Sequence, residues 1–300
     1  MADASLRGVI PAVLTPFTED ERVDCGALAA ICRRTIDAGV SALFINGSTG
    51  SGPLLTREEA AANVRAAVDA AEGRVPVLAG VGSNATSTAI DLARDAAEAG
   101  AAVAVSQTPF YFPLSRCELM GYFADLIVAS PIPVALYNIP QLTNNVLSTD
   151  MIAELAGDRR CVGMKDSSGD MEAMLRTIAL KAGAPAFLVW QGAEPLAASS
   201  MLAGADGIVS GTANVAPAMV LAVYEAARSG DIEPARARQE SLSRLRRFYS
   251  AGTPRRVMGV CLEMLGVCAA HQRRPYHEPT DEGRALIRSC LAEAGLLPPS

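Results

Sequence analysis

The feature that most limits how this chain can fold is a repeated alternation of short apolar runs with longer helical patterns. Three segments, DAGVSALFIN, EAGAAVAVSQ and LAGADGIVSG, each join a helix-like stretch ending in Ala-Gly to a short apolar run. Glycine commonly follows the C-terminus of a helix, so each segment predicts a helix, its end and then a buried strand. Eight runs of this kind predict strands at 8–15, 41–46, 75–81, 101–107, 132–138, 161–165, 187–191 and 206–211.

The stretches between these runs are rich in Ala, Leu, Arg and Glu and predict helices. Strands that are nearly all apolar and alternate with helices indicate a parallel sheet that is covered by those helices. Eight such units within residues 1–230 match a closed (βα)8 barrel, the TIM barrel of the α/β class, better than an open doubly wound sheet. An open sheet should carry a glycine-rich phosphate turn after its first strand, and TPFTEDE contains none. The helices are expected at 25–38, 56–71, 87–98, 116–129, 148–156, 170–182, 194–203 and 216–229.

The last part of the chain, residues 231–300, has a different pattern. It predicts a C-terminal helical extension in which Pro234, Pro254 and Pro275 mark breaks. Its apolar residues follow one stripe, which would face water if the segment stood alone. We therefore expect the extension to pack on the barrel.

Composition argues against several classes of function. Half of the 300 residues are hydrophobic and 19% are charged, so the chain can bury a large core. A net charge of −6 and the lack of a basic stripe argue against a nucleic-acid partner. The seven cysteines contain no CxxC pair and only two histidines are present, so neither a metal nor another cofactor is expected. The N-terminus has no signal-peptide pattern and no run of about 18 apolar residues occurs, which predicts a soluble cytoplasmic protein without a membrane partner.

Polar residues gather where the predicted strands end. In a TIM barrel the active site lies at the carboxyl ends of the strands, so these residues should meet in one place. The set is dominated by hydroxyl groups, glycines, two tyrosines and a lysine. It comprises residues 15–16, 46–51 (NGSTGS), 82–84, 108–112 (TPFYF), 137–140 (YNIP), 165–167, 191–194 and 210–214.

One of these residues, Lys165, is unusual for this chain, because it is one of only two lysines among 26 lysines and arginines. An ammonium can lose its proton and attack a carbonyl carbon, whereas a guanidinium stays protonated. Lys165 is therefore a candidate imine-forming nucleophile. The alternative from the residues alone is a structural ion pair with Asp166 or another carboxylate. The other lysine, Lys181, closes a predicted helix and is expected at the surface.

Imine chemistry needs two further groups. A proton shuttle is required near the imine, and Tyr137, at the end of the neighbouring predicted strand, is the candidate. A group is also required to hold the substrate carboxylate. Ser48 and Thr49 offer hydroxyls and backbone N–H groups in a glycine-flanked turn, which can bind an anion without a formal cation.

Five motifs at these strand ends resemble a known family. GSTG at 47–50, TPFYF at 108–112, YNIP at 137–140, GMKDSSGD at 163–170 and GADGIVSGTANV at 204–215 are similar to the dihydrodipicolinate synthase and N-acetylneuraminate lyase family of pyruvate-dependent class I aldolases. The similarity covers about residues 7–230. It implies a lyase that forms a Schiff base with pyruvate as one partner and an aldehyde as the other.

The resemblance also assigns roles. It implies that Lys165 is the Schiff-base lysine, that Tyr137 is the proton relay, and that Tyr111 is a second catalytic tyrosine, often lent across a dimer interface. Ser48 and Thr49 match the pair that holds the pyruvate carboxylate. Gly192 and Val209 match positions of backbone contacts to substrate. The family is usually a dimer of dimers, so a homo-oligomer is expected.

Two departures from the family pattern bear on the substrate. Leu142 stands where the lysine-biosynthetic synthases have a carboxylate-binding arginine, and Ser51 replaces the usual glutamate. No arginine lies in the strand-end segments, so a second substrate carboxylate would lack an evident partner. Ser167, Gln191 and Glu194 could instead bind substrate hydroxyls, as the matching positions do in the sugar-acid lyases.

These features predict a lyase that splits or forms a 2-keto-3-deoxy sugar acid or a related 4-hydroxy-2-oxo acid. A keto-deoxy sugar acid dehydratase and a dihydrodipicolinate synthase are alternatives within the family. An alternative of another class is a non-catalytic keto-acid sensor. Retention of both Tyr137 and Lys165 argues against a sensor, because pure binding has no use for an amine with a proton relay beside it.

Overall fold

The computed structural model describes residues 6–298 and contains one sheet of eight parallel strands. Their order is β1-β8-β7-β6-β5-β4-β3-β2, and a parallel bridge between Ala12 and Phe44 joins the two ends of that series. The sheet therefore curls into a nearly closed TIM barrel, as the sequence predicts. The strands are β1 (Gly8–Pro11), β2 (Leu43–Ile45), β3 (Val77–Gly80), β4 (Val103–Gln107), β5 (Val134–Asn138), β6 (Cys161–Asp166), β7 (Leu188–Gln191) and β8 (Gly207–Ser210).

The first strand is shorter than the predicted range of 8–15. Beyond Pro11 the chain changes partners, because the N–H of Ala12 donates to Ser210 and the N–H of Val13 donates to Phe44. The residues after β1 thus bond in turn to both neighbouring strands and help to close the barrel.

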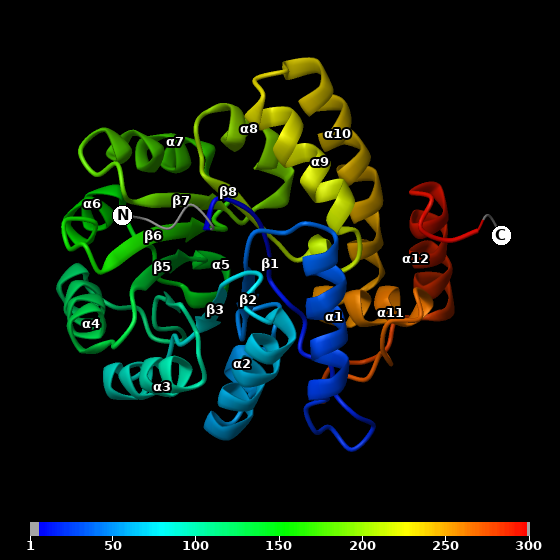
Figure 1. The fold of residues 1–300 in the computed structure, drawn as a ribbon, viewed down its shortest axis with the longest axis horizontal. Coiled ribbons are helices and arrows are strands. Elements are labelled where there is room, and N and C mark those ends of the chain that lie inside the picture. The colour runs from blue at the N-terminus through cyan, green and yellow to red at the C-terminus, as the bar shows by residue number, and fades with distance from the viewer. Residues whose placement is uncertain (1–5, 299–300) are drawn as a thin grey trace.

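Helices surround the strands, and each predicted helix is present within one or two residues of its expected ends or as two adjoining pieces (Figure 1). Local capping explains some of these boundaries. Thr56 and Ser115 each form a capping box with the glutamate three residues later, which satisfies free N–H groups at the start of α2 and α4. The helices are α1 (Cys25–Asp37), α2 (Arg57–Ala71), α3 (Thr86–Glu98), α4 (Arg116–Ala129), α5 (Pro140–Thr143), α6 (Thr149–Leu155), α7 (Met171–Ala179), α8 (Ala197–Leu202) and α9 (Pro217–Arg228).

The hydrophobic core has two parts on the two sides of the sheet. Alternate strand residues point outward into the larger part, which lies between the strands and the helices. The others point inward and fill the barrel, where Phe44, Tyr137 and Trp190 are the largest side chains. Trp190 donates its indole N–H to the carbonyl of Leu6 at 2.8 Å, which anchors the ring inside the barrel. The interior is thus packed below its open end.

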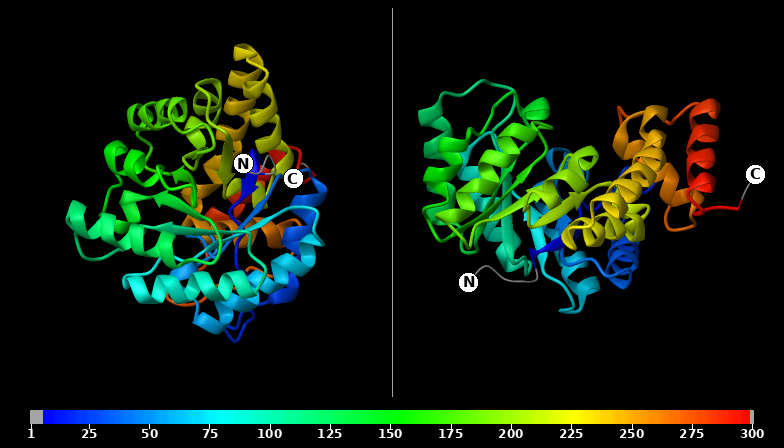
Figure 2. Two further views of the ribbon diagram at one scale, coloured as in Figure 1. Left: turned by 60° about the vertical axis from the view of Figure 1, so that its left-hand side comes forward. Right: turned by 90° about the horizontal axis from the view of Figure 1, so that it is seen from above.

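The C-terminal extension consists of α10 (Ile232–Leu245), a 3-10 helix η6 (Arg246–Ala251), α11 (Pro254–Met264) and α12 (Asp281–Glu293). The predicted boundary at residue 230 falls in the turn between α9 and α10. Figure 2 shows α11 and α12 at one edge of the molecule, beyond α10. Arg273, which follows α11, forms a paired salt bridge with Glu59 of α2, at 2.6 and 3.0 Å. The extension is therefore tied to the barrel by charged contacts as well as by packing.

The expectation that Pro234 breaks the extension is wrong, because it lies inside α10. It occupies the first turn, where the backbone N–H that proline lacks would have no helical partner anyway. Pro254 is the first residue of α11, so that break is confirmed.

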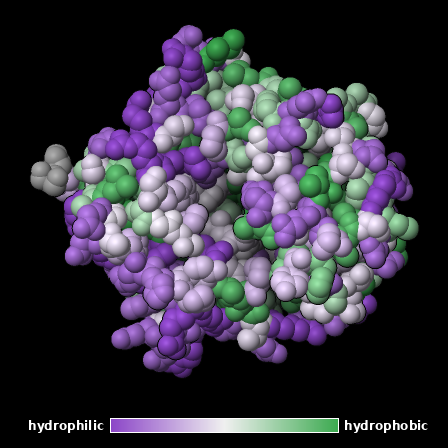
Figure 3. All heavy atoms as spheres, turned by 180° about the vertical axis from the view of Figure 1, so that it is seen from behind, coloured by the Kyte–Doolittle hydropathy of each residue, from purple (hydrophilic) through white to green (hydrophobic). Residues whose placement is uncertain are grey.

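The surface carries no single large apolar face on the side seen in Figure 3, where hydrophilic and hydrophobic residues are mixed. Within residues 6–298, no helix has the length and apolarity needed to cross a bilayer.

Candidate active site

The two residues expected to do the chemistry lie side by side inside the mouth of the barrel. Tyr137 of β5 and Lys165 of β6 are register partners on adjacent strands. The Nζ atom of Lys165 lies 4.1 Å from the centroid of the Tyr137 ring and 5.2 Å from that of Phe44. Lys165 is only 5% exposed.

The alternative of a structural ion pair for Lys165 is not supported. Among residues 6–298, no carboxylate lies within 4.0 Å of its Nζ. The carboxylate of the adjacent Asp166 instead accepts the N–H of Ser168 at 2.6 Å. A buried amine held against aromatic rings, and free of a carboxylate, is suited to react with a carbonyl group.

The hydroxyl of Tyr137 is held by its neighbours. It lies 3.1 Å from the Oγ atom of Ser48. Burial alone would raise the pKa of Tyr137, but the positive charge of Lys165 and hydrogen bonds from Ser48, Ser167 and Lys165 outweigh it, so the pKa lies below its ordinary value. A tyrosine that ionises more readily can both accept and return a proton.

The loop that carries Ser48 and Thr49 is fixed by close backbone contacts. Asn46, which begins it, has a φ of 58°, and its side chain bonds to the carbonyl of Ala60 and to Asn63. A Cβ at Gly80 would lie 2.7 Å from the Asn46 carbonyl carbon, so only glycine lets β3 approach the loop this closely. The Ser48 hydroxyl is therefore held in a defined place beside Tyr137.

Gly192, at the end of β7, lies directly against the lysine. A Cβ there would lie 2.7 Å from the Cε atom of Lys165 and would overlap the Oγ atom of Ser167. Ser167 thus reaches the same region as Lys165. Val209 of β8 lies in the interior cluster of the barrel.

Tyr111 lies outside the buried group around Lys165. It is 75% exposed, has a φ of 78°, and packs edge-on against Phe112. Within one chain it is part of the surface and not of the buried group around Lys165.

Gln191 points away from the mouth, toward the helices outside the barrel. Its Nε2 atom donates to the Oγ of Ser200 in α8 at 2.7 Å, and its Oε1 atom accepts the N–H of Ala193 at 2.7 Å. The side chain is buried with its hydrogen bonds satisfied by the protein. This geometry contradicts the expectation that Gln191 binds a substrate hydroxyl.

The carboxylate of Glu194 is likewise occupied by hydrogen bonds from other residues of the protein. Its buried carboxylate accepts hydrogen bonds from the Oγ of Ser210, from the N–H and Oγ1 of Thr212, and from the Nε of Arg246, at 2.5–2.8 Å. The expectation that Glu194 binds substrate hydroxyls is therefore contradicted too. Its role in the structure is to join the barrel to η6 of the extension.

A cavity of about 310 Å3 opens beside Ser48 and Tyr137. Two of its lining residues, Arg255 and Tyr276, come from the extension and were not expected from the sequence. An Nη1 atom of Arg255 donates to the carbonyl of Ser48 at 3.2 Å, and its guanidinium lies 4.5 Å from the ring centroid of Tyr276. An arginine therefore lines the cavity although none lies in the strand-end segments. Arg255 lies about 90 residues after Lys165 in the chain, and nothing in TPRRV distinguishes it from a surface arginine.

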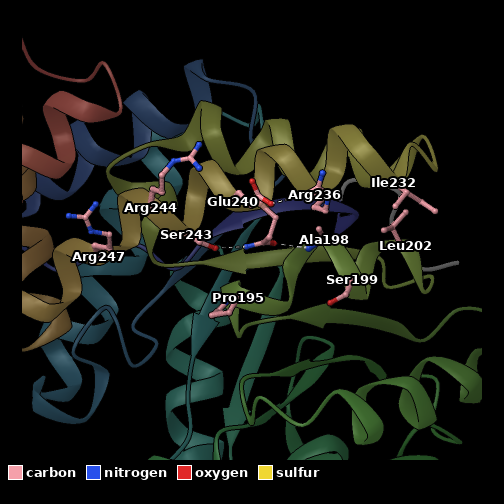
Figure 4. Close-up of a pocket in the computed structure, with 11 residues that line it drawn as sticks. Pro195, Ala198, Ser199, Leu202, Ile232, Arg236, Glu240, Ser243, Arg244 and Arg247 are labelled. Atoms are coloured by element: carbon pink, nitrogen blue, oxygen red, sulfur yellow. Dashed lines mark hydrogen bonds and ion pairs between the residues drawn. The ribbon is translucent and has the colours of Figure 1, made fainter.

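A larger groove, of about 570 Å3, lies between α8 and α10 on the outside of the barrel. Figure 4 shows its lining, in which Arg236 pairs with Glu240. It contains neither a lysine nor a tyrosine, so its size does not make it the site of the expected chemistry.

Comparison with known proteins shows the family of this chain. The model of the dihydrodipicolinate synthetase family matches residues 5–294. An uncharacterized DapA-like lyase from Halobacterium salinarum is 37% identical over 292 residues, which cover 97% of this chain and 95% of the relative. The 4-hydroxy-tetrahydrodipicolinate synthase of Hyphomonas neptunium is 37% identical over 289 residues, covering 96% and 98% of the two chains.

A solved structure of the same family is similar to this chain in sequence and in fold. YagE, a prophage protein of the dihydrodipicolinic acid synthase family from E. coli K12, was solved in complex with pyruvate and matches with a TM-score of 0.92. The two chains are 31% identical, and the match covers 97% of this chain and 99% of YagE. With the barrel, the buried lysine and tyrosine, and these matches along nearly its whole length, the chain belongs to the dihydrodipicolinate synthetase family, whose members include lyases and synthases of the class I aldolase type.

Proposed function

We propose that this protein forms a Schiff base between Lys165 and a 2-oxo acid, and that it cleaves or forms a 2-keto-3-deoxy sugar acid or a related 4-hydroxy-2-oxo acid. The observation that carries the proposal is the buried pair of Lys165 and Tyr137, with 4.1 Å between the Nζ and the ring centroid. The pyruvate bound by YagE supports pyruvate as one partner.

The cleavage reaction assigns a task to each group. The amine of Lys165 adds to the C2 carbonyl of the substrate, and water leaves as the imine forms. Tyr137, as the phenolate, removes the proton of the C4 hydroxyl. The electrons of the C3–C4 bond then move into the imine, which releases the aldehyde and leaves an enamine.

The second half returns the enzyme to its starting state. Tyr137 gives its proton back to C3 of the enamine, and water hydrolyses the resulting imine to pyruvate and free Lys165. Throughout, Ser48 and Thr49 hold the carboxylate of the 2-oxo acid, and the Ser48 hydroxyl also steadies Tyr137. Gly192 and Val209 contribute backbone contacts, and Ser167 lies beside the amine.

Trapping tests the lysine directly. The protein is incubated with pyruvate and borohydride, and the adduct is located by peptide mass spectrometry. Because the chain has only two lysines, Lys165→Arg and Lys181→Arg form a matched pair. We expect the adduct in Lys181→Arg and its loss in Lys165→Arg. An adduct that survives in Lys165→Arg would refute the assignment.

Cleavage of a panel of 4-hydroxy-2-oxo acids tests the reaction. Release of pyruvate supports aldol cleavage. Release of water without pyruvate would mean the dehydratase alternative, which uses the same imine. If the protein turns over no member of the panel, the proposed cleavage reaction is wrong.

We also propose that the protein acts as a cytoplasmic homo-oligomer in which Tyr111 reaches a neighbouring subunit. Tyr111 and Phe112 are exposed by 75% and 65%, which is unusual for two adjacent aromatic side chains. All seven cysteines are free, which suits a reducing compartment. Light scattering should give a mass above that of one chain, and Tyr111→Asp should lower it.

A further inference from the structure

We infer that Arg255 selects the second substrate by binding an anionic group at the end remote from the imine. This inference rests on the proposed function and adds a substrate class to it: aldehydes that carry a carboxylate or a phosphate.

The formal charge of the cavity lining is positive only. Arg255 is the only formally charged residue among the described residues that line it, and no aspartate or glutamate is among them. Much of the remaining lining is apolar, including Leu54, Leu55, Phe110 and Leu142. A lone cation beside apolar side chains attracts an anion more strongly than the same cation in water would.

Arg255 has unused hydrogen-bonding capacity. Within residues 6–298 it has no carboxylate within 4.0 Å, and its buried Nε has no partner. A guanidinium has five N–H donors, and one hydrogen bond, from Nη1 to the carbonyl of Ser48, is present. The next residue, Arg256, shows the contrast, because its guanidinium pairs with Glu278 and the carbonyl of Ala270.

Arg255 is also held in place before any ligand arrives. It lies in the first turn of α11, which starts at Pro254, and its guanidinium stacks on Tyr276 at 4.5 Å. Such stacking restricts the side chain while leaving the edge of the guanidinium free. The cost of ordering a flexible arginine on binding is therefore reduced.

A second unpartnered group lies in the same cavity. The Oγ atom of Ser51 is buried and has no hydrogen-bond partner among the described residues. Ser51 and Arg255 both line the cavity next to Ser48. An anionic group bound there can accept hydrogen bonds from both, while the 2-oxo acid end of the substrate lies at Ser48, Tyr137 and Lys165.

Binding of unreactive mimics tests this without turnover. The protein is first reduced with pyruvate and borohydride, so that the 2-oxo acid position is filled. The dissociation constants of 4-hydroxybutyrate and of neutral 1,4-butanediol are then measured by calorimetry for the wild type, Arg255→Met and Arg255→Lys. Arg236→Met, a change at an exposed arginine of the outer groove, is the control.

We expect Arg255→Met to weaken binding of 4-hydroxybutyrate by about 30-fold, as removal of one partner from a buried charge pair does, and to leave butanediol unchanged. Arg255→Lys should give a smaller loss, because it keeps the charge but not the planar fork. Equal loss of both ligands, or no loss of either, would show that Arg255 serves only to hold Ser48, and the inference would fail.

A second panel, of aldehydes, distinguishes a carboxylate from a phosphate as the bound anionic group. Pyruvate is combined with succinic semialdehyde, glyceraldehyde 3-phosphate or glyceraldehyde, and kcat/KM is compared between wild type and Arg255→Met. A selective loss for the first compound assigns a carboxylate and a selective loss for the second a phosphate. Preference of the wild type for glyceraldehyde would overturn the inference. Failure of the wild type to trap pyruvate at Lys165 would instead refute the proposed function, so the two failures are distinguishable.

Discussion

The Nζ atom of Lys165 lies 4.1 Å from the centre of the Tyr137 ring, because the two residues are paired on adjacent parallel strands. The tyrosine hydroxyl is thereby held next to any imine that forms on the lysine. We predict that Tyr137→Phe lowers kcat by about 100-fold or more, since general acid-base groups contribute factors of this size. The pyruvyl adduct at Lys165 should still form. Steady-state kinetics combined with borohydride trapping measures both.

The control for this change is Tyr122→Phe. Tyr122 is also a buried tyrosine with a hydrogen-bonded hydroxyl, but its partners are Ser106 and the N–H of Ser83, and its ring packs outside the barrel. Tyr122→Phe should therefore affect stability while leaving kcat within about twofold of the wild type. If both variants lose the same activity, Tyr137 is a structural residue and not the proton relay.

Ser48→Ala should move the ionisation of Tyr137 to higher pH. Burial raises the pKa of Tyr137. The charge of Lys165 and the hydrogen bonds lower this pKa by a larger amount, so the net shift is downward. Removal of the Ser48 hydrogen bond takes away one of the lowering effects, so the pKa rises toward its ordinary value. Spectroscopic titration of Ser48→Ala, compared with Ser48→Ala/Tyr137→Phe, isolates this tyrosine. A shift to lower pH would contradict the assigned cause.

Gly192→Ala should strongly lower activity in a protein that still folds. The added Cβ would meet the Cε atom of Lys165 at 2.7 Å and the Asp166 carbonyl oxygen at 3.0 Å, so the lysine must move. We expect kcat to fall by about 100-fold, as displacement of a reacting group by about 1 Å can cause. Gly121→Ala in α4 is the control, because a Cβ there meets nothing within 4 Å. It should keep full activity and gain up to about 1 kcal/mol in unfolding free energy.

Most of the barrel could be predicted from the sequence because its signals are local. Several apolar runs are preceded or followed by glycine, and the strand after Ala-Gly in LAGADGIVSG begins at Gly207, within one residue of its predicted start. Lys165 and Tyr137 could be placed together for the same reason, since both end a predicted strand of a barrel with known order. The place of Pro234 could not be predicted, because a proline alone does not distinguish a helix break from the first turn of a helix.

The side chains in the site wall could not be predicted from local patterns. Gln191 is the last residue of β7 and Glu194 follows soon after it, yet the directions of their side chains depend on Ser200 and Arg246, which lie in other elements. Arg255 reaches the cavity only because α11 folds back over the barrel. Contacts of this kind join segments that are distant in the chain, so no spacing in the sequence reports them.

The salt bridge between Glu194 and Arg246 joins the barrel to the extension. We propose that residues 1–230 and 231–300 unfold as one unit. The Glu194 carboxylate is buried, and Arg246, which is 24% exposed, is its only cationic partner among the described residues. Arg246→Ala leaves that carboxylate without its cation and should lower the unfolding free energy by about 3 kcal/mol in a single transition. Arg236→Ala, which removes an exposed pair with Glu240, should change the unfolding free energy by less than about 0.5 kcal/mol.

Denaturant unfolding followed by both far-UV circular dichroism and Trp190 fluorescence tests whether the two parts unfold together. Two separate transitions would show that the extension is an independent domain, because Trp190 reports on the barrel interior alone while circular dichroism reports on helices of both parts.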